Sequence, residues 1–124
     1  MFYSHIFILL LFTKKNVICN CLSFSFNVGI FSKSTRKSLN ASVNFLEKYK
    51  FIGVGRDDGE KKGEFCAIYF DTTLYEILDY STFWLSETPD LVSVGWDASL
   101  ERICTYGLFA STHSGEKFWV FNTH

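Results

Sequence analysis

Three residues near the end of the chain, Arg102, Asn122 and His124, have side chains that suit an anionic group such as a phosphate. A guanidinium and an amide donate hydrogen bonds to anionic oxygens, and an imidazole can donate, accept or carry a proton. The three residues lie in two apolar, strand-like runs that flank a polar stretch at residues 111–115. This pattern predicts a β-hairpin.

The register of that hairpin decides whether the three side chains meet. A loop over residues 111–115 would place Arg102 opposite His124 and Cys104 opposite Asn122, with all of these side chains on one face. A shift of one residue would move Arg102 and His124 to opposite faces. In the alternative interpretation, the same residues form a solvated strand end without a binding role.

The composition indicates one small domain with a packed core. The chain has 124 residues, of which 48% are hydrophobic and 19% aromatic, and its net charge is −1. These values are typical of a folded domain and exclude a disordered or strongly polyanion-binding chain. The charge is uneven, because all 13 acidic residues lie from Glu47 onward. This asymmetry indicates two segments of different character.

From residue 51 onward, apolar runs with a period of two predict largely antiparallel strands. Before them, Ser38 is a suitable helix cap, and an apolar stripe from Leu39 to Leu46 predicts a helix over residues 38–50. The expected strands cover residues 51–55, 64–70, 74–81, 102–109 and 118–124.

The first part of the chain allows several interpretations. Residues 1–12 are almost wholly apolar but too few for a membrane-spanning helix, which needs about 20 residues. They have the length of a signal-peptide core, yet no basic residue precedes them, and a buried strand fits as well. Secreted, membrane-associated and cytoplasmic locations therefore all stay open. Alternation over residues 22–27 predicts a strand, and residues 32–37 form a polar break.

Neither the cysteines nor the paired aspartates predict a metal site. The spacing of the four cysteines is not that of a zinc site, so we expect reduced or structural thiols. Asp57 and Asp58 would attract a cation, but a glycine-framed charged loop favours a solvated turn. The cysteines are Cys19, Cys21, Cys66 and Cys104.

Several short motifs between residues 52 and 124 occur in a specific order. They are IGVGRDDG at 52–59, TFWLSETP at 82–89, GWDA at 95–98, RICT at 102–105 and FNTH at 121–124. Together they resemble the endonuclease/exonuclease/phosphatase superfamily, and especially its deoxyribonuclease-I-like hydrolases of bacterial type. The resemblance covers about three fifths of the chain.

The resemblance implies an α/β (α+β) fold, here a partial four-layer α/β sandwich that is mostly antiparallel sheet from residue 51 onward. It implies hydrolysis of a phosphodiester or phosphomonoester, in nucleic acid or a small molecule, with Mg²⁺ or Mn²⁺. His124 would contact the scissile phosphate and Asn122 would hold the strand end, both as catalytic-site residues. Arg102 would bind the substrate phosphate, and Glu87 and Asp97 would shape the loop rim.

The chain also departs from the family pattern. The family's metal-binding glutamate lies in a Gln-Glu pair upstream of the helix that precedes Phe51, but this chain has no glutamate before Glu47. The family's Gly-Asp-x-Asn and final Asp-His motifs follow the position of His124 and are absent. Magnesium prefers several oxygen ligands, so we expect no bound metal here unless Glu64 or Glu87 supplies a site.

We therefore expect an internal fragment of a metal-dependent phosphoesterase that is inactive alone. Residues 38–124 would be the partial domain, and residues 1–37 an uncertain segment that either belongs to the domain or is unrelated to it. The alternative is a non-catalytic fold remnant or interaction module, completed by another chain. No protein partner is evident, and the apolar start leaves a membrane partner open.

Overall fold

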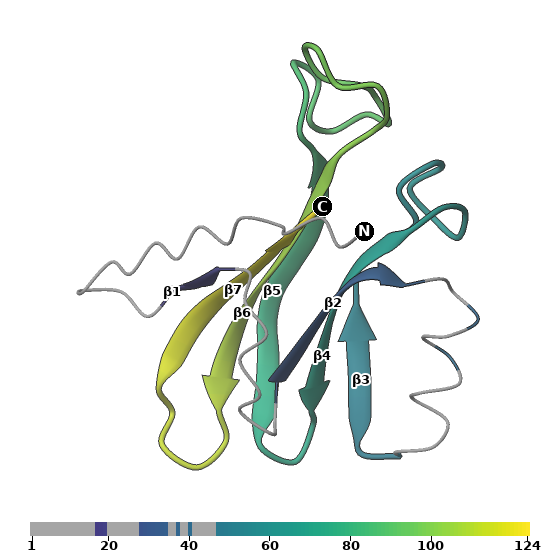
Figure 1. Cartoon of the computed structure of the whole chain (residues 1–124). Coiled ribbons are helices and arrows are strands. Elements are labelled where there is room, and N and C mark those ends of the chain that lie inside the picture. The colour runs from purple at the N-terminus through teal and green to yellow at the C-terminus, as the bar shows by residue number, and fades with distance from the viewer. Residues whose placement is uncertain (1–16, 20–27, 35–36, 38–39, 41–46) are drawn as a thin grey trace, which may run out of the picture.

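The computed structural model describes residues 17–19, 28–34, 37, 40 and 47–124, which form two β-sheets (Figure 1). One sheet has four strands in the order β1-β7-β6-β5, and the other has three in the order β2-β4-β3. The strands are β1 (Val17–Cys19), β2 (Val28–Ser34), β3 (Tyr49–Ile52), β4 (Phe65–Asp71), β5 (Tyr75–Trp84), β6 (Ile103–Ser111) and β7 (Lys117–Thr123).

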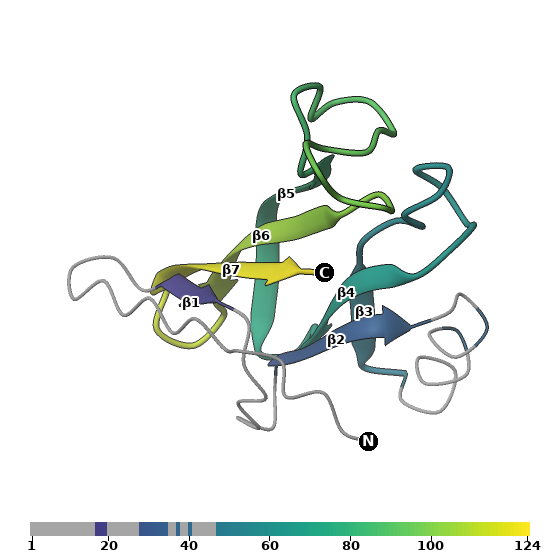
Figure 2. The ribbon, with the colours of Figure 1, turned by 45° about the horizontal axis from the view of Figure 1, so that its top comes forward.

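The sheets are mostly antiparallel, as the sequence predicts, but they do not form one meander. The chain passes from the second sheet to the first between β4 and β5, and β5, β6 and β7 then follow as a meander (Figure 2). The only parallel pair among the described strands is β1 with β7. Two packed sheets are the centre of the expected sandwich.

Burial explains why the strands form where they do. Every residue of β4 is buried, and its run of apolar residues is typical of a strand that is covered on both faces. In β6, by contrast, burial alternates after Thr105, which marks a strand with one inward and one outward face.

The core lies between the sheets. Ile68 and Phe70 of β4 pack there against Phe109 of β6 and Val120 of β7, and Ile52 completes the cluster. The Phe70 and Phe109 rings meet edge to face, with centroids 5.1 Å apart. Burial of these side chains fixes the position of β7 over β4.

The predicted helix and polar break are each partly wrong. Lys37 and Asn40 are helical, but Tyr49 and Lys50 belong to β3, where pairing with β4 outweighs the helical pattern. Glu47 and Lys48 form a turn, and the remaining helix positions lie outside the described residues. The expected break at residues 32–37 begins too early, since β2 continues to Ser34 through a bulge.

Two other predictions, the apolar start at residues 1–12 and the strand at 22–27, lie outside the described residues. Within the part of the chain that the structure describes, no helix has the length and apolar character needed to cross a membrane.

Candidate functional site at the ends of two sheets

The β6–β7 hairpin forms as predicted, but its register is shifted by one residue. Asn122 lies opposite Thr105, and Cys104 lies opposite Thr123. His124 exchanges both backbone hydrogen bonds with Ile103, at 3.2 and 3.0 Å. The predicted pairing of Arg102 with His124 is therefore wrong.

The turn explains the shift. Ser111 still belongs to β6, and its amide bonds to the carbonyl of Glu116 at 2.9 Å. Gly115 takes a left-handed conformation with φ of 71° and donates to the carbonyl of Ser111. The loop between Ser111 and Glu116 therefore has four residues, 112–115, one fewer than the predicted five. Because side chains alternate, Arg102 moves to the face opposite His124.

Asn122 joins the two sheets below the site. Its side chain is fully buried, and Nδ2 donates a hydrogen bond to the carbonyl oxygen of Ala67 in β4 at 3.1 Å. This bond links β7 to β4. It sets the end of β7 beside the start of β4.

At that junction, His124 meets Glu64, the residue immediately before β4. His124 Nε2 lies 3.0 Å from Glu64 Oε2, and Nη1 of the Arg56 guanidinium donates to the same oxygen at 3.1 Å. The His124 and Arg56 side chains are only 15% and 11% exposed, while that of Glu64 is 37% exposed. One carboxylate thus orients an imidazole and a guanidinium.

The loop between β3 and β4 holds Arg56 in place. The Arg56 amide donates to the carbonyl of Glu64, and the indole Nε1 of Trp84 donates to the carbonyl of Arg56 at 3.0 Å. Asp57 Oδ1 lies 3.4 Å from the guanidinium Nε. Hydrogen bonds of the Arg56 backbone with Glu64 and Trp84 therefore fix the point from which the Arg56 side chain extends.

Asp58, in the same loop, forms a turn of its own. Its Oδ1 accepts the amides of Glu60, Lys61 and Lys62 at 2.8 to 2.9 Å. The bonds from Lys62 and Glu60 lower the pKa of Asp58 below its ordinary value. The Asp58 carboxylate thus accepts hydrogen bonds from the backbone of its own loop, which agrees with the predicted solvated turn.

Cys66 lies in β4 near the same charged groups but has no nucleophilic character. Burial raises the pKa of its thiol to about 12, and its sulfur lies 3.8 Å from the carbonyl of Ile103. Cys66 and Cys104 are both free thiols in the core. Both agree with the sequence prediction for reduced cysteines.

The residues described at this site do not fit a magnesium ion. Glu64 is the carboxylate at its centre, and Arg56 and His124 share the same Glu64 oxygen. Throughout the described ranges, no group of three or more His, Cys, Asp or Glu side chains is placed to hold a metal. Magnesium prefers octahedral oxygen ligands, which a single engaged carboxylate does not provide.

The loop between β5 and β6 forms the other side of this end of the molecule. It extends beyond the sheets on the same side as the loop at residues 53–64, and the C-terminus lies at that end too (Figures 1 and 2). Glu87 and Asp97, predicted to shape a rim, are exposed on it. The site is thus a strand end flanked by two loops.

Sequence reasoning did not place Glu64 and Arg56 in the site. Arg56 was visible only as part of a motif, and Glu64 only as a possible metal ligand. Their contacts with each other follow from the backbone pairing of Arg56 with Glu64 across a tight loop. Their contact with His124 joins residues 60 positions apart, for which the sequence carries no periodic signal.

Solved structures of one family resemble this fold. No family model matches the chain. A structure of an endonuclease/exonuclease/phosphatase family protein from Bacteroides thetaiotaomicron is 43% identical and has a TM-score of 0.78, over 81% of this chain. A similar protein from Bacteroides vulgatus is 37% identical with a TM-score of 0.77, over 79% of the chain.

The chain carries part of an endonuclease/exonuclease/phosphatase fold.

Two further matches set the extent of this likeness. The mannosyl-6-phosphatase of Bacteroides thetaiotaomicron VPI-5482 is 43% identical with a TM-score of 0.77, over 79% of this chain. The uncharacterized protein L388 of Acanthamoeba polyphaga mimivirus is 43% identical over 44 residues, which is 33% of this chain and 16% of that protein. The chain spans only 37 to 38% of the three Bacteroides structures, as expected for part of an endonuclease/exonuclease/phosphatase domain.

Proposed function

We propose that the chain provides the phosphate-binding part of a phosphoester hydrolase. One observation carries this proposal: His124 and Arg56 converge on Glu64 at the strand ends of an endonuclease/exonuclease/phosphatase fold. Hydrolysis of a phosphodiester or phosphomonoester requires positive or proton-donating groups beside the phosphate oxygens.

In this proposal, Glu64 orients the imidazole so that Nδ1 of His124 is directed to the substrate. When His124 is protonated, Nδ1 donates to a phosphate oxygen while Nε2 stays bonded to Glu64. Arg56 fixes Glu64 from the other side and adds positive charge near the phosphate. Asn122 acts on the site only by holding the end of β7 against β4.

Hydrolysis also requires groups besides His124, Glu64 and Arg56. We propose that a divalent metal, Mg²⁺ or Mn²⁺, and the carboxylates that bind it belong to parts of the fold that this chain does not supply. Positioning and metal charge account for most of phosphoryl-transfer catalysis. The chain alone is therefore expected to bind phosphate weakly and to hydrolyse no ester.

A chimaera tests this proposal. Residues 47–124 would replace the matching part of the Bacteroides mannosyl-6-phosphatase, which supplies the remainder of the fold. We expect the chimaera to release phosphate from the host enzyme's substrate, and His124→Ala to lower that rate by about a hundredfold or more. Glu64→Gln should have a similar effect.

The control is the isolated chain, assayed with an aryl phosphodiester and with Mg²⁺ or Mn²⁺. We expect no hydrolysis above the His124→Ala background. Activity of the folded chimaera that does not depend on His124 would contradict the proposal. His124-dependent hydrolysis by the isolated chain would mean that its own carboxylates complete the site.

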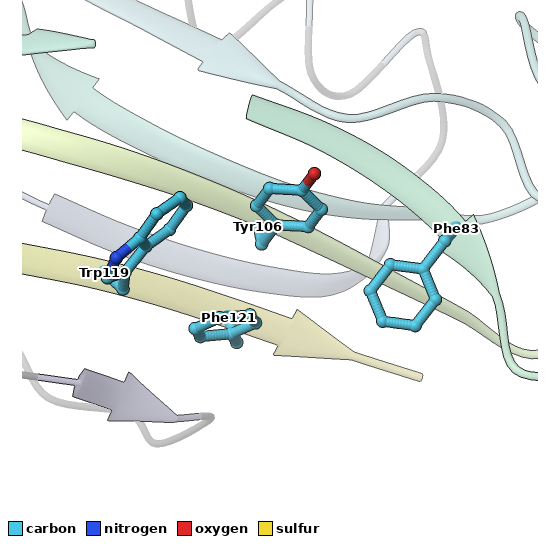
Figure 3. Close-up of a pocket in the computed structure, with 4 residues that line it drawn as sticks. All are labelled: Phe83, Tyr106, Trp119 and Phe121. Atoms are coloured by element: carbon cyan, nitrogen blue, oxygen red, sulfur yellow. The ribbon is translucent and has the colours of Figure 1, made fainter. Parts of the chain in front are cut away.

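The aromatic groove on the outer face of the β5–β6–β7 sheet favours a second candidate, an interaction module. Tyr106, Trp119 and Phe121 line an open groove of about 320 Å³ together with Phe83 (Figure 3). The Tyr106 ring contacts both Trp119 and Phe121, with centroids 5.7 and 5.9 Å away. A non-catalytic remnant could use such a face to bind a polypeptide. Phosphate binding that depends on Glu64 and His124 favours the first candidate.

A further inference from the structure

Three hydroxyl side chains of the loop between β5 and β6, residues 85–102, bond to one another. The hydroxyls of Ser86 and Ser93 lie 2.6 Å apart, and Thr88 Oγ1 bonds to Ser93 Oγ at 2.9 Å. Ser93 Oγ also bonds to the carbonyl of Leu91, and Ser86 Oγ accepts the amide of Thr88. The loop is therefore built around hydrogen bonds of its own.

Its apolar side chains face outward instead. Trp96 is 72% exposed, Leu91 63%, Leu100 48% and Val94 47%. A loop that exposes several large apolar side chains resembles a binding surface more than an ordinary solvated loop.

The backbone presents Trp96 in a specific way. Its φ of 46° is left-handed, an uncommon conformation for a bulky residue, which persists where its surroundings enforce it. The amide of Ala98 bonds to the carbonyl of Gly95 at 2.9 Å and closes the turn that carries the indole. Trp96 is thus held outward by a defined turn.

This surface lies beside the proposed phosphate site. A Cβ atom placed on Gly59 would lie 3.7 Å from Cγ2 of Val92, so the loop packs against the one that carries Arg56. Both loops extend beyond the strand ends at which His124 lies (Figures 1 and 2). Residues 85–102 and the loop that carries Arg56 thus lie at the same end of the molecule.

The charge of the rim favours one class of molecule. Residues 85–102 contain four acids and a single base, and residues 53–64 contain four acids and three bases. This net negative charge repels a chain of phosphates but tolerates a single one that Arg56 and His124 neutralise. Trp96 and its apolar neighbours suit an uncharged, planar or apolar leaving group.

We propose that residues 85–102 hold the uncharged leaving group of a small phosphate ester against Trp96, and that the acidic rim excludes nucleic acid. This inference rests on the proposed phosphate site and adds the substrate class that the site accepts.

Titration of the full 124-residue chain, followed by nuclear magnetic resonance, tests the inference with three probes: inorganic phosphate, phenyl phosphate and a short oligothymidylate. We expect phenyl phosphate to bind about fivefold to tenfold more tightly than phosphate. Trp96→Ala should remove that difference without changing the affinity for phosphate. Trp96→Phe should keep most of it.

Tyr80→Ala is the matched control, because Tyr80 is an exposed aromatic residue on β5, outside this loop. Equal affinities for phosphate and phenyl phosphate in the wild-type chain, with phosphate binding intact, would overturn the inference alone. Tighter binding of the oligothymidylate that Trp96→Ala abolishes would also overturn it, in favour of nucleic acid. Loss of all phosphate binding would overturn both the inference and the proposed function.

Discussion

Glu64 is the residue on which the proposed site depends. Its Oε2 atom accepts from Arg56 and contacts His124, so it sets the position of both groups from one point. Removing its charge would leave the largely buried Arg56 guanidinium without its closest partner. A carboxylate in this role orients the phosphate-binding groups and has no need to touch the phosphate.

A comparison of two arginines tests this arrangement at the residue level. Arg56→Ala should weaken phosphate binding severalfold, since it removes positive charge and frees Glu64. Arg102→Ala should have little effect, because the register places Arg102 on the face opposite His124. Affinities of the two variants from a phosphate titration would settle this point. A larger loss from Arg102→Ala would restore the role that the motif implied.

Asp71 gives a prediction about pH at the far end of β4 from the site. Hydrogen bonds from Lys48 and Thr73 lower the pKa of this carboxyl from 3.8 to about 2. A lowered pKa means that the ionised form stabilises the fold at neutral pH, and that this contribution disappears as the pH falls from about 4 to about 2. Asp71→Asn should therefore be less stable than wild type at pH 7, with the difference narrowing over that range.

Urea denaturation of both proteins at a series of pH values measures this difference. If the difference between the urea midpoints of wild type and Asp71→Asn stays constant down to pH 2, the Asp71 charge does not cause the stability difference.

At the level of elements, β7 carries the site because it pairs with β6 and packs on β4. Asn122→Ala should lower the free energy of unfolding by about 1–3 kcal/mol, since the buried carbonyl of Ala67 loses its donor. Thr123→Ala is the control, because Thr123 faces the other side of the sheet. It should cost about 0.5 kcal/mol or less in the same urea denaturation. Equal losses of unfolding free energy in the two variants would mean that the Asn122–Ala67 hydrogen bond contributes little to stability.

The sequence allowed prediction of the strands from residue 51 onward and of the hairpin, because period-two patterns and turn residues are local signals. It did not fix the register, which depends on the left-handed Gly115 and on Ser111 staying in β6. Family motifs brought His124 and Asn122 to attention, yet the contact of His124 with Glu64 depends on the packing of one sheet against another. Such contacts have no sequence period and appear only in three dimensions.

At the level of the whole molecule, the aromatic groove on the outer face has a measurable consequence. Phe121 and Trp119 line it with partly exposed rings, so the chain should bind a hydrophobic dye. Phe121→Ser should reduce the dye fluorescence by about half. Tyr80→Ser, at a residue that is 57% exposed but outside the groove, should change it little. Equal reductions would place the dye elsewhere.

The central claim is that His124, oriented by Glu64, binds a phosphate. The most direct measurement follows the imidazole resonances of the ¹⁵N-histidine-labelled chain during titration with inorganic phosphate. His113, on the exposed β6–β7 turn, serves as an internal reference. We predict a saturable shift of the His124 resonances, no comparable shift of His113, and loss of the His124 response in Glu64→Gln. Equal small shifts of both histidines, or a His124 response unchanged by Glu64→Gln, would contradict the claim.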